Sequence, residues 1–253
     1  MDVSPLIVLG LAALCAGFID SVVGGGGLVQ IPAVFSILPR ETPAALFCAA
    51  KIAGLSGTSY AAWRYARRVS MPWRIIVPAA LATFPFAYLG AMAVAWLPRE
   101  LLRPMILVLL IVAAVYTFRH KEFGTVHQPR LSGTREWLSA ATVGGALGFY
   151  EGFFGPGSGS FLIFLFIRVF GLDFLHASAT AKLINAMANL AAIAYFVPHG
   201  HFLPLAAVVM AVGNITGSSI GTAMALRHGS GFVRRMFLCV VGVLIVKFAW
   251  DTF

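Results

Sequence analysis

Two lysines lie well inside apolar segments of the sequence. Lys51 belongs to the run AALFCAAKIAG, and Lys182 belongs to SATAKLINAMAN. A charged side chain at the centre of a bilayer costs roughly 3 kcal/mol or more, so such a residue is a functional hypothesis by default. We expect the two ammonium groups to bind an anionic substrate. The alternative is that each lysine is neutralised by a carboxylate within the protein.

Each lysine follows a stretch in which a carboxylate precedes a group of glycines. Residues 17–32 read GFIDSVVGGGGLVQIP and contain Asp20, while residues 148–162 read GFYEGFFGPGSGSFL and contain Glu151. Glycine in a helix interior costs about 1 kcal/mol relative to alanine, so both stretches break an otherwise apolar helix. Asp20 and Glu151 are the obvious partners for the lysines. They could also carry protons, or cap the turns by accepting glycine N–H bonds.

The two breaks suit an anion site. Non-helical backbone at membrane depth is tolerated where it faces protein or a water-filled cavity. We expect half-helices to begin near Leu28 and near Ser160, with their positive N-terminal ends towards that cavity. The alternative is that the glycines only allow close helix packing. The predicted substrate-binding residues are Lys51, Lys182, Gly25, Gly26, Gly27, Gly157, Ser158, Gly159, Ser160, Asn185, Asn189 and Thr58.

Asn185 and Asn189 are included because they follow Lys182 by three and seven residues, on the same helix face. The repeat described next places Gly54 and Thr58 at the corresponding positions of the first half. The predicted site is therefore only pseudo-symmetric, with more polar donors in the second half.

The chain is a tandem duplication. At an offset of 131, the difference between 182 and 51, Asp20 aligns with Glu151 and Gly90 with Gly221. We predict two units, 1–118 and 137–253, joined by a cytoplasmic linker, 119–136. Each unit has a glycine-broken stretch followed by three helices of about 20 residues, the length that spans a bilayer. The predicted ranges are 3–38, 43–63, 73–97 and 101–118, then 137–170, 174–197, 202–226 and 232–250.

Composition places the chain in the membrane. It is 60% hydrophobic and 11% charged, with a mean hydropathy of +0.90, whereas soluble domains carry about 25% charged residues. The net charge of +9 lies in short loops, which indicates a lipid bilayer and not nucleic acid as the partner. We predict no metal and no cofactor, even at the loop that carries His199 and His201. No catalytic motif is recognised, so no enzyme is expected.

The loop charges favour a chain that turns back at each break. In that arrangement one side of the membrane collects twelve Lys and Arg residues and the other side three. A chain that crossed at each break would give nearly equal numbers. By the positive-inside rule, both termini then lie outside. We therefore predict an all-α polytopic membrane protein of two inverted repeats, each with a re-entrant-like helix pair plus three transmembrane helices.

On these two glycine-rich stretches, each followed by its lysine-bearing helix, the sequence resembles the sulfite exporter TauE/SafE family of membrane permeases. The resemblance covers essentially the whole chain. It implies a multi-pass carrier of the inner membrane for sulfite, sulfoacetate or another small organosulfur or carboxylate anion. The chain departs from the family pattern at Glu151, where aspartate is commoner, and at 47–50, where small polar residues are more usual.

The function predicted is a secondary transporter for a small anion, working by alternating access between inverted repeats. A passive anion channel with the same lining is the first alternative. A membrane-embedded enzyme or a partner subunit of one is the second. A homodimer is plausible, although no residue argues for it specifically.

Overall fold

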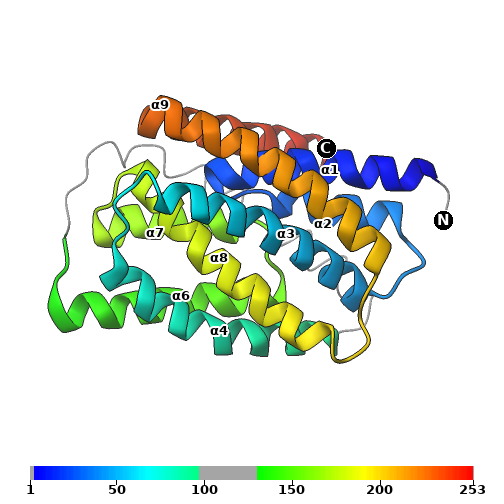
Figure 1. The fold of residues 1–253 in the computed structure, drawn as a ribbon, viewed down its shortest axis with the longest axis horizontal. Helices are drawn as coiled ribbons and strands as arrows, with labels where there is room; N and C mark the ends of the chain where they lie inside the picture. The colour runs from blue at the N-terminus through cyan, green and yellow to red at the C-terminus, as the bar shows by residue number, and fades with distance from the viewer. Residues whose placement is uncertain (1–2, 97–129, 253) are drawn as a thin grey trace.

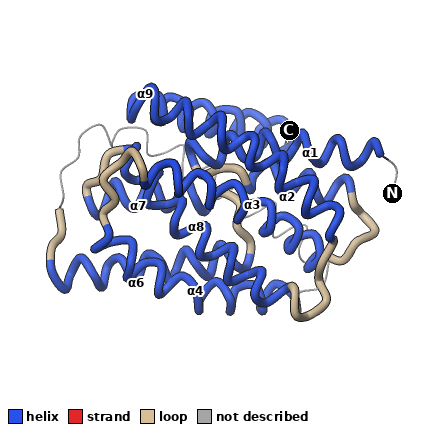
Figure 2. Tube along the Cα trace, viewed as in Figure 1, coloured by secondary structure: helices blue, strands red, loops and turns tan. Residues whose placement is uncertain are grey.

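The computed structural model describes residues 3–96 and 130–252, and these are helical apart from short connections (Figure 2). No strand occurs among the described residues, as expected for an all-α membrane protein. The helices run side by side in an elongated bundle (Figure 1). The predicted helix 101–118 lies outside the described residues.

The first glycine-broken stretch forms a helical hairpin. Helix α1 (Val3–Val23) ends just before the break and α2 (Gly27–Ile37) follows it. Leu9, near the beginning of α1, shares one hydrophobic cluster with Val34 and Leu38 at the far end of α2. The shorter helix therefore runs back along the first instead of continuing across.

The second broken stretch turns back in the same way. Helix α6 (Gly133–Phe153) is followed by α7 (Ser158–Phe170), which ends at Gly171 in the left-handed conformation. The backbone N–H of Arg130 donates to the carbonyl of Phe170 at 3.2 Å, and the Arg130 side chain donates to the carbonyl of Arg168. The start of α6 thus lies beside the end of α7. With 11 and 13 residues, α2 and α7 are too short to span about 30 Å of hydrocarbon.

The lysines lie on two long helices with well-formed starts. Helix α3 (Pro43–Ala66) is capped by the Thr42 hydroxyl, which accepts from the N–H of Ala45, and has proline at its first position. Helix α8 (Phe174–Phe196) is capped by Asp173, which accepts from the N–H of His176. Both caps fall at the predicted helix starts.

The remaining boundaries differ slightly from those predicted. Helix α4 (Trp73–Ala95) matches, but α6 begins at Gly133, inside the predicted linker. Helix α9 (Pro204–Thr252) joins the two predicted final helices, because helical backbone continues on both sides of a kink at Gly229, where φ is +69°. After this kink the chain turns and runs back towards the end of the bundle that holds the N-terminus (Figure 1).

Glycines bring α1 against α9 and α6 against α4. A Cβ built on Gly221 of α9 would lie 2.6 Å from the carbonyl oxygen of Phe18, and Gly90 of α4 packs equally closely on Phe149. These two contacts are images of each other at the offset of 131. Small residues allow such backbone approach between membrane helices. The two halves of the chain are therefore interlocked.

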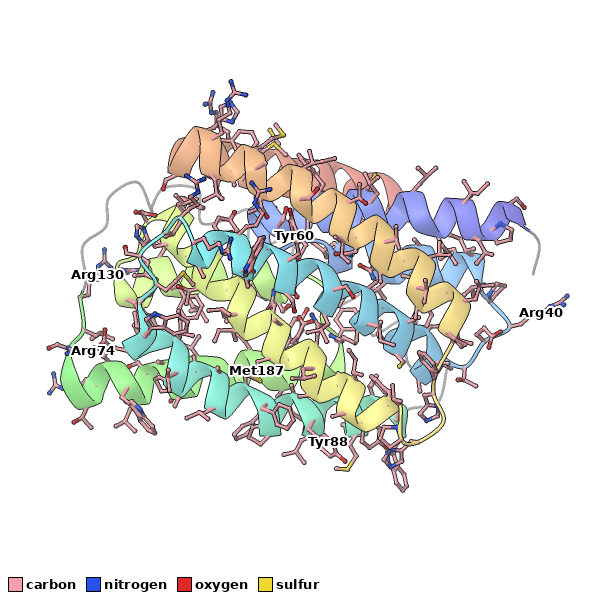
Figure 3. The ribbon with its side chains drawn as sticks, in the orientation of Figure 1. Arg40, Tyr60, Arg74, Tyr88, Arg130 and Met187 are labelled. Carbon is pink, nitrogen blue, oxygen red and sulfur yellow. The ribbon has the colours of Figure 1, made fainter. Side chains whose placement is uncertain are left out.

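The outer surface is that of a membrane protein. Three of the described helical segments are long and apolar enough to cross a bilayer: Ser4–Val23, Trp73–Ala95 and Pro204–Val233. They carry exposed apolar side chains, such as Leu81 and Val208, on the outside of the bundle. Arg74 and Arg130 lie at one end of the bundle and Arg40 at the other (Figure 3). Apolar side chains on the outside and arginines at the two ends are the distribution expected of helices that span a bilayer.

Candidate functional site

The two glycine-rich breaks meet inside the bundle. Gly24 adopts φ +76°, and a Cβ built on it would lie 2.7 Å from Cα of Gly159. Gly27 packs against Pro156 of the opposite break, with 3.1 Å from a built Cβ to Cα. Backbone therefore rests on backbone at the centre of the molecule. A larger residue at Gly24 would require the backbone around Gly159 to move.

Lys51 is paired with the carboxylate of the other repeat. Its Nζ lies 2.7 Å from Oε1 of Glu151 and also donates to the main-chain carbonyl of that residue. The second carboxylate oxygen, Oε2, accepts from the hydroxyl of Ser158. Both charged side chains are about nine-tenths buried or more. The Lys51 ammonium group thus satisfies a main-chain carbonyl in the last turn of α6, just before the break.

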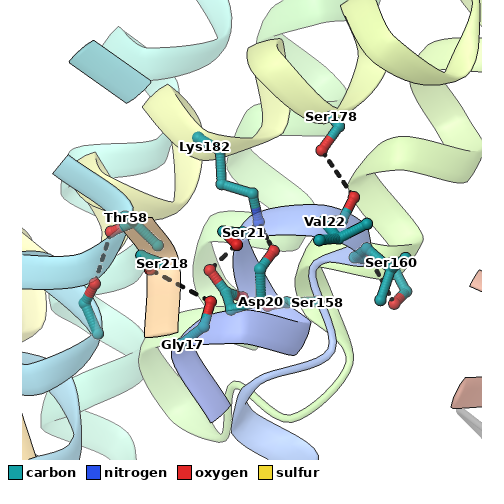
Figure 4. Close-up of polar contacts among 12 residues, drawn as sticks. Gly17, Asp20, Ser21, Val22, Thr58, Ser158, Ser160, Ser178, Lys182 and Ser218 are labelled. Atoms are coloured by element: carbon teal, nitrogen blue, oxygen red, sulfur yellow. Dashed lines mark hydrogen bonds and ion pairs between the residues drawn. The ribbon is translucent and has the colours of Figure 1, made fainter. Parts of the chain in front are cut away.

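Lys182 makes the corresponding contact in the opposite direction. Its Nζ lies 3.2 Å from Oδ2 of Asp20 and donates to the Asp20 main-chain carbonyl (Figure 4). The Lys182 side chain is fully buried. At the offset of 131 this pair is the image of the first. Each lysine therefore neutralises the carboxylate of the other repeat, which is the alternative that the sequence left open.

These pairs replace the capping role considered for the carboxylates. Within the described residues, Asp20 and Glu151 accept side-chain hydrogen bonds from lysine and serine, and not from the glycine amides. Removing one member of such a pair would leave a buried charge without a partner, which typically costs 3–5 kcal/mol. The pairs therefore hold the repeats together, and Asp20, Lys51 and Glu151 also line the cavity described below.

Hydroxyl groups satisfy the carbonyls freed where α1 ends. Ser160 donates to the carbonyl of Val23 at 2.9 Å, and Ser178 donates to that of Val22 at 3.0 Å (Figure 4). Tyr65 donates to the carbonyl of Ser21 at 3.0 Å. Broken helices in membranes need such partners. Ser160 thus supports the break, instead of presenting its hydroxyl to a ligand.

A cavity of about 40 Å³ lies beside the breaks. A site needs roughly 10–15 Å³ to hold one water, so this cavity holds a few waters or one small anion. Its lining is predominantly polar or glycine. The lining residues are Asp20, Gly24, Gly26, Gly27, Gln30, Ile31, Ala50, Lys51, Gly54, Thr58, Glu151, Phe154, Gly155, Ser158, Asn185, Asn189 and Asn214.

The structure places most, but not all, of the predicted binding residues at this cavity. Gly26, Gly27, Lys51, Thr58, Ser158, Asn185 and Asn189 line it, together with Asp20 and Glu151. Five predicted residues are absent from the lining: Gly25, Gly157, Gly159, Ser160 and Lys182. Gly159 is excluded because it packs on Gly24, and Lys182 because it is enclosed by its contact with Asp20.

Two polar residues of the lining were missed in the sequence. Gln30 donates from Nε2 to the carbonyl of Ala50 at 3.0 Å, and its Oε1 accepts from Nδ2 of Asn214 at 2.9 Å. Both side chains are buried in apolar helices. A polar residue in an apolar segment was itself a usable signal. The buried acceptors Asn185 Oδ1 and Asn214 Oδ1 have no hydrogen-bond partner among the described residues.

A second polar cluster joins the repeats at the end of the bundle that holds Arg130. Ser70 Oγ lies 3.0 Å from Nε2 of His176, whose Nδ1 lies 2.8 Å from Oδ2 of Asp173. Ser230, beside the α9 kink, donates to Oδ1 of Asp173. Burial alone would raise the pKa of Asp173, but hydrogen bonds and charge from His176, with the bond from Ser230, outweigh it and lower the pKa to about 2. The sequence spacing did not indicate this Ser–His–Asp arrangement, which links the α3–α4 connection to α8 and α9.

The fold and site together define a polytopic helical membrane protein with paired broken helices around a buried polar cavity. The family model "Sulfite exporter TauE/SafE" matches residues 9–248, and the chain belongs to this family.

Curated relatives cover nearly the whole chain. The probable membrane transporter protein YfcA of Escherichia coli strain K12 is 34% identical over 99% of this chain and 92% of its own length. The probable membrane transporter protein ORF9 of Sinorhizobium sp is 32% identical over 97% of the chain and 93% of its own length. A probable membrane transporter protein of Haemophilus influenzae is 28% identical over 97% and 95%, respectively. No solved structure matches the chain significantly.

Proposed function

We propose that this protein is a secondary transporter of the inner membrane for a small anion, of the sulfite, sulfonate or related organosulfur class. The observation that carries the proposal is the pair of buried lysines, each held by the carboxylate of the opposite repeat beside a central cavity. Membership of the TauE/SafE family, and the names of the relatives, agree with a transporter.

The cavity chemistry supports an oxyanion as the ligand. Lys51 supplies an ammonium group, and Thr58 and Ser158 bring hydroxyls to the lining, which donate to the Gly54 carbonyl and to Glu151 in this structure. Asn185 and Asn189 add side-chain amides with N–H donors. Charge-assisted hydrogen bonds to an oxyanion are roughly twice as strong as neutral ones, so a single lysine among these donors is a substantial share of the binding energy. The volume of about 40 Å³ suits a compact anion better than an extended one.

The directions of the helices support inverted repeats. Helix α3 runs parallel to α1, because Tyr65 near its end bonds Ser21 near the end of α1, and Leu46 near its start packs in the cluster of Leu9. Helix α4 runs opposite to α3, since Ile75 near its start clusters with Tyr65 near the end of α3.

The glycine contacts extend this relationship to the second repeat. Gly144 and Gly152 of α6 pack on Ala79 and Ala87 of α4, so these two helices are parallel. Helix α6 is therefore antiparallel to its repeat counterpart α1. Repeats of opposite direction around a central site are typical of carriers that work by alternating access, with the substrate near the midplane.

A passive anion channel is the alternative within the same architecture. The two buried ion pairs beside the cavity favour a carrier, since an open pore would need a continuous water-filled path. Lys51 would release Glu151 when the substrate binds and re-form the pair when it leaves.

Flux into proteoliposomes tests the proposal. Purified protein is reconstituted, and uptake of labelled sulfite, methanesulfonate and sulfoacetate is followed as a function of concentration. We expect saturable uptake of at least one of these anions, and its loss in Lys51→Ala. The matched control is Arg74→Ala, which removes an exposed cation at the end of the bundle and leaves uptake unchanged. Undiminished uptake in a folded Lys51→Ala protein would contradict the proposed site, and uptake that never saturates would favour the channel.

A further inference from the structure

We propose that the cavity takes up one proton with each anion, and that Glu151, not its repeat counterpart Asp20, is the proton-binding group. This inference rests on the proposed function and names a second ligand of the same site. It comes from a difference between the two otherwise matching ion pairs.

The Lys51–Glu151 pair belongs to the cavity, whereas the other pair belongs to it only in part. Lys51 and Glu151 both line the cavity. Lys182 does not line it, and its fully buried side chain places the ammonium group against Asp20. An anion that enters the cavity can therefore replace Glu151 as the partner of Lys51. It has no comparable access to Lys182.

Glu151 also has a neighbouring hydroxyl that can accept a hydrogen bond from its protonated form, and the position that corresponds to this hydroxyl beside Asp20 carries none. The hydroxyl of Ser158 bonds Oε2 of Glu151, and a hydroxyl can accept as well as donate. A protonated Glu151 can thus donate its new hydrogen to Ser158. The residue that corresponds to Ser158 in the first repeat is Gly27, which has no side chain. The neutral acid is therefore accommodated at Glu151 and not at Asp20.

Charge balance requires a proton. The lining carries Lys51, Asp20 and Glu151, and the enclosed Lys182 pairs with Asp20, so these four groups are together formally neutral and give an entering anion no net attraction. One proton from water binds Oε2 of Glu151, and the ion pair between Lys51 Nζ and Oε1 breaks. The freed ammonium then donates to the anion, and one monovalent anion plus one proton leaves the charge unchanged. On release the proton returns to water and the pair re-forms.

The groups that face Glu151 come from every element around it. Lys51 approaches from α3 and Ser158 from α7, and Asp20 on α1 also lines the cavity. Lys182 on α8 is held by Asp20, and the neighbouring Tyr150 donates its hydroxyl to the carbonyl of Pro156. The cavity is also lined by the uncharged side chains of Gln30 on α2, Asn185 and Asn189 on α8, and Asn214 on α9. Helix α4 packs on α6 through Thr83 and Ala87. Among these, Lys51 is the one cation in contact with Glu151.

Methanesulfonate is the probe for this inference, because it is fully ionised near neutral pH and carries no proton of its own. Proteoliposomes with an entrapped pH dye report proton movement, and labelled methanesulfonate reports anion flux. We expect one proton per anion in the wild-type protein. In Glu151→Gln we expect the proton-to-anion ratio to fall to about zero and accumulation driven by a pH gradient to be lost, whatever rate of exchange the variant retains. In Glu151→Asp the ratio should stay at about one, and any flux that folded Asp20→Asn retains should show the same ratio as the wild type.

Several outcomes would overturn the inference. They are anion flux without proton movement in the wild-type protein, proton coupling that survives in Glu151→Gln, and coupling lost in Asp20→Asn while exchange remains. The wild-type ratio decides whether a proton accompanies the anion even where a variant does not fold, and Glu151→Asp and Glu151→Gln together decide whether Glu151 binds it. Proton uptake is also measured on adding methanesulfonate to weakly buffered protein in detergent. If wild-type protein takes up one proton on binding but shows no flux, the transporter function fails and the proton site stands.

Discussion

Lys182 donates to both the side-chain and the main-chain oxygen of Asp20 from a side chain with no exposed surface. The contact joins residues that are 162 positions apart in the chain. It therefore ties the end of α1 in one repeat to the middle of α8 in the other. Its mirror contact, between Lys51 and Glu151, ties α3 to α6.

The Lys182 contact predicts strong coupling between its two members. Lys182→Met leaves the Asp20 carboxylate buried without a counter-charge, so we expect a loss of about 3–5 kcal/mol in the free energy of unfolding. The double variant Lys182→Met/Asp20→Asn removes both charges and should recover part of that loss. Denaturant unfolding in detergent micelles measures the difference as a double-mutant cycle. Additive effects of the two single changes would contradict the pairing.

The contact between the breaks predicts that Gly159 tolerates no side chain. A Cβ on Gly159 would lie 2.6 Å from Cα of Gly24, so Gly159→Ala must push the two breaks apart. We expect a fall in the thermal unfolding midpoint and a loss of anion flux together. Gly231→Ala is the matched control, because a Cβ there meets no atom within 4 Å. Equal midpoints for the two variants would mean that the breaks do not pack as described.

The Asp173 cluster predicts acid sensitivity at one end of the bundle. The pKa of Asp173 in the folded protein, about 2, lies below its ordinary value of 3.8. A lowered carboxyl pKa stabilises the folded state above about pH 3.8, and this contribution is lost as the pH falls towards 2. Asp173→Asn keeps a good helix cap but removes the charge, so we expect it to cost about 2 kcal/mol at pH 7. The difference between wild type and variant should shrink below pH 4 in denaturant titrations, and a constant difference down to pH 2 would contradict it.

The hairpins predict that both termini lie on the outer side of the membrane. Arg74 and Arg130 mark the end that the positive-inside rule assigns to the cytoplasm, and the N-terminus lies at the other end (Figures 1 and 3). In a background with Cys15, Cys48 and Cys239 replaced, cysteines at positions 2 and 252 should react with an impermeant maleimide from outside.

The exposed Arg68→Cys on the α3–α4 connection provides the opposite-side control for that labelling. It should stay unlabelled until the membrane is opened. Termini that label from opposite sides would overturn the inverted arrangement.

Much of this architecture could be predicted from local features of the sequence. Apolar runs of bilayer length, the cost of glycine in a helix and the repeated order of carboxylate, glycines and lysine predicted the breaks and helices α3, α4 and α8 to within a few residues. The loop charges predicted that the breaks turn back, because the bias of Lys and Arg depends on which loops share a side. The hairpin contacts at Arg130 and at Leu9 agree with that.

The partners of the charged groups were decided by the tertiary structure. The spacing showed that Lys51, Lys182, Asp20 and Glu151 belonged together, but not that each lysine would cross to the other repeat. Which side chains reach the cavity depends on how each helix is rotated against its neighbours. Lys182 and Ser160 were lost from the lining for this reason, and Gln30 and Asn214 were added. A sequence fixes the identity and spacing of charges along a helix, whereas their partners depend on contacts between helices far apart in the chain.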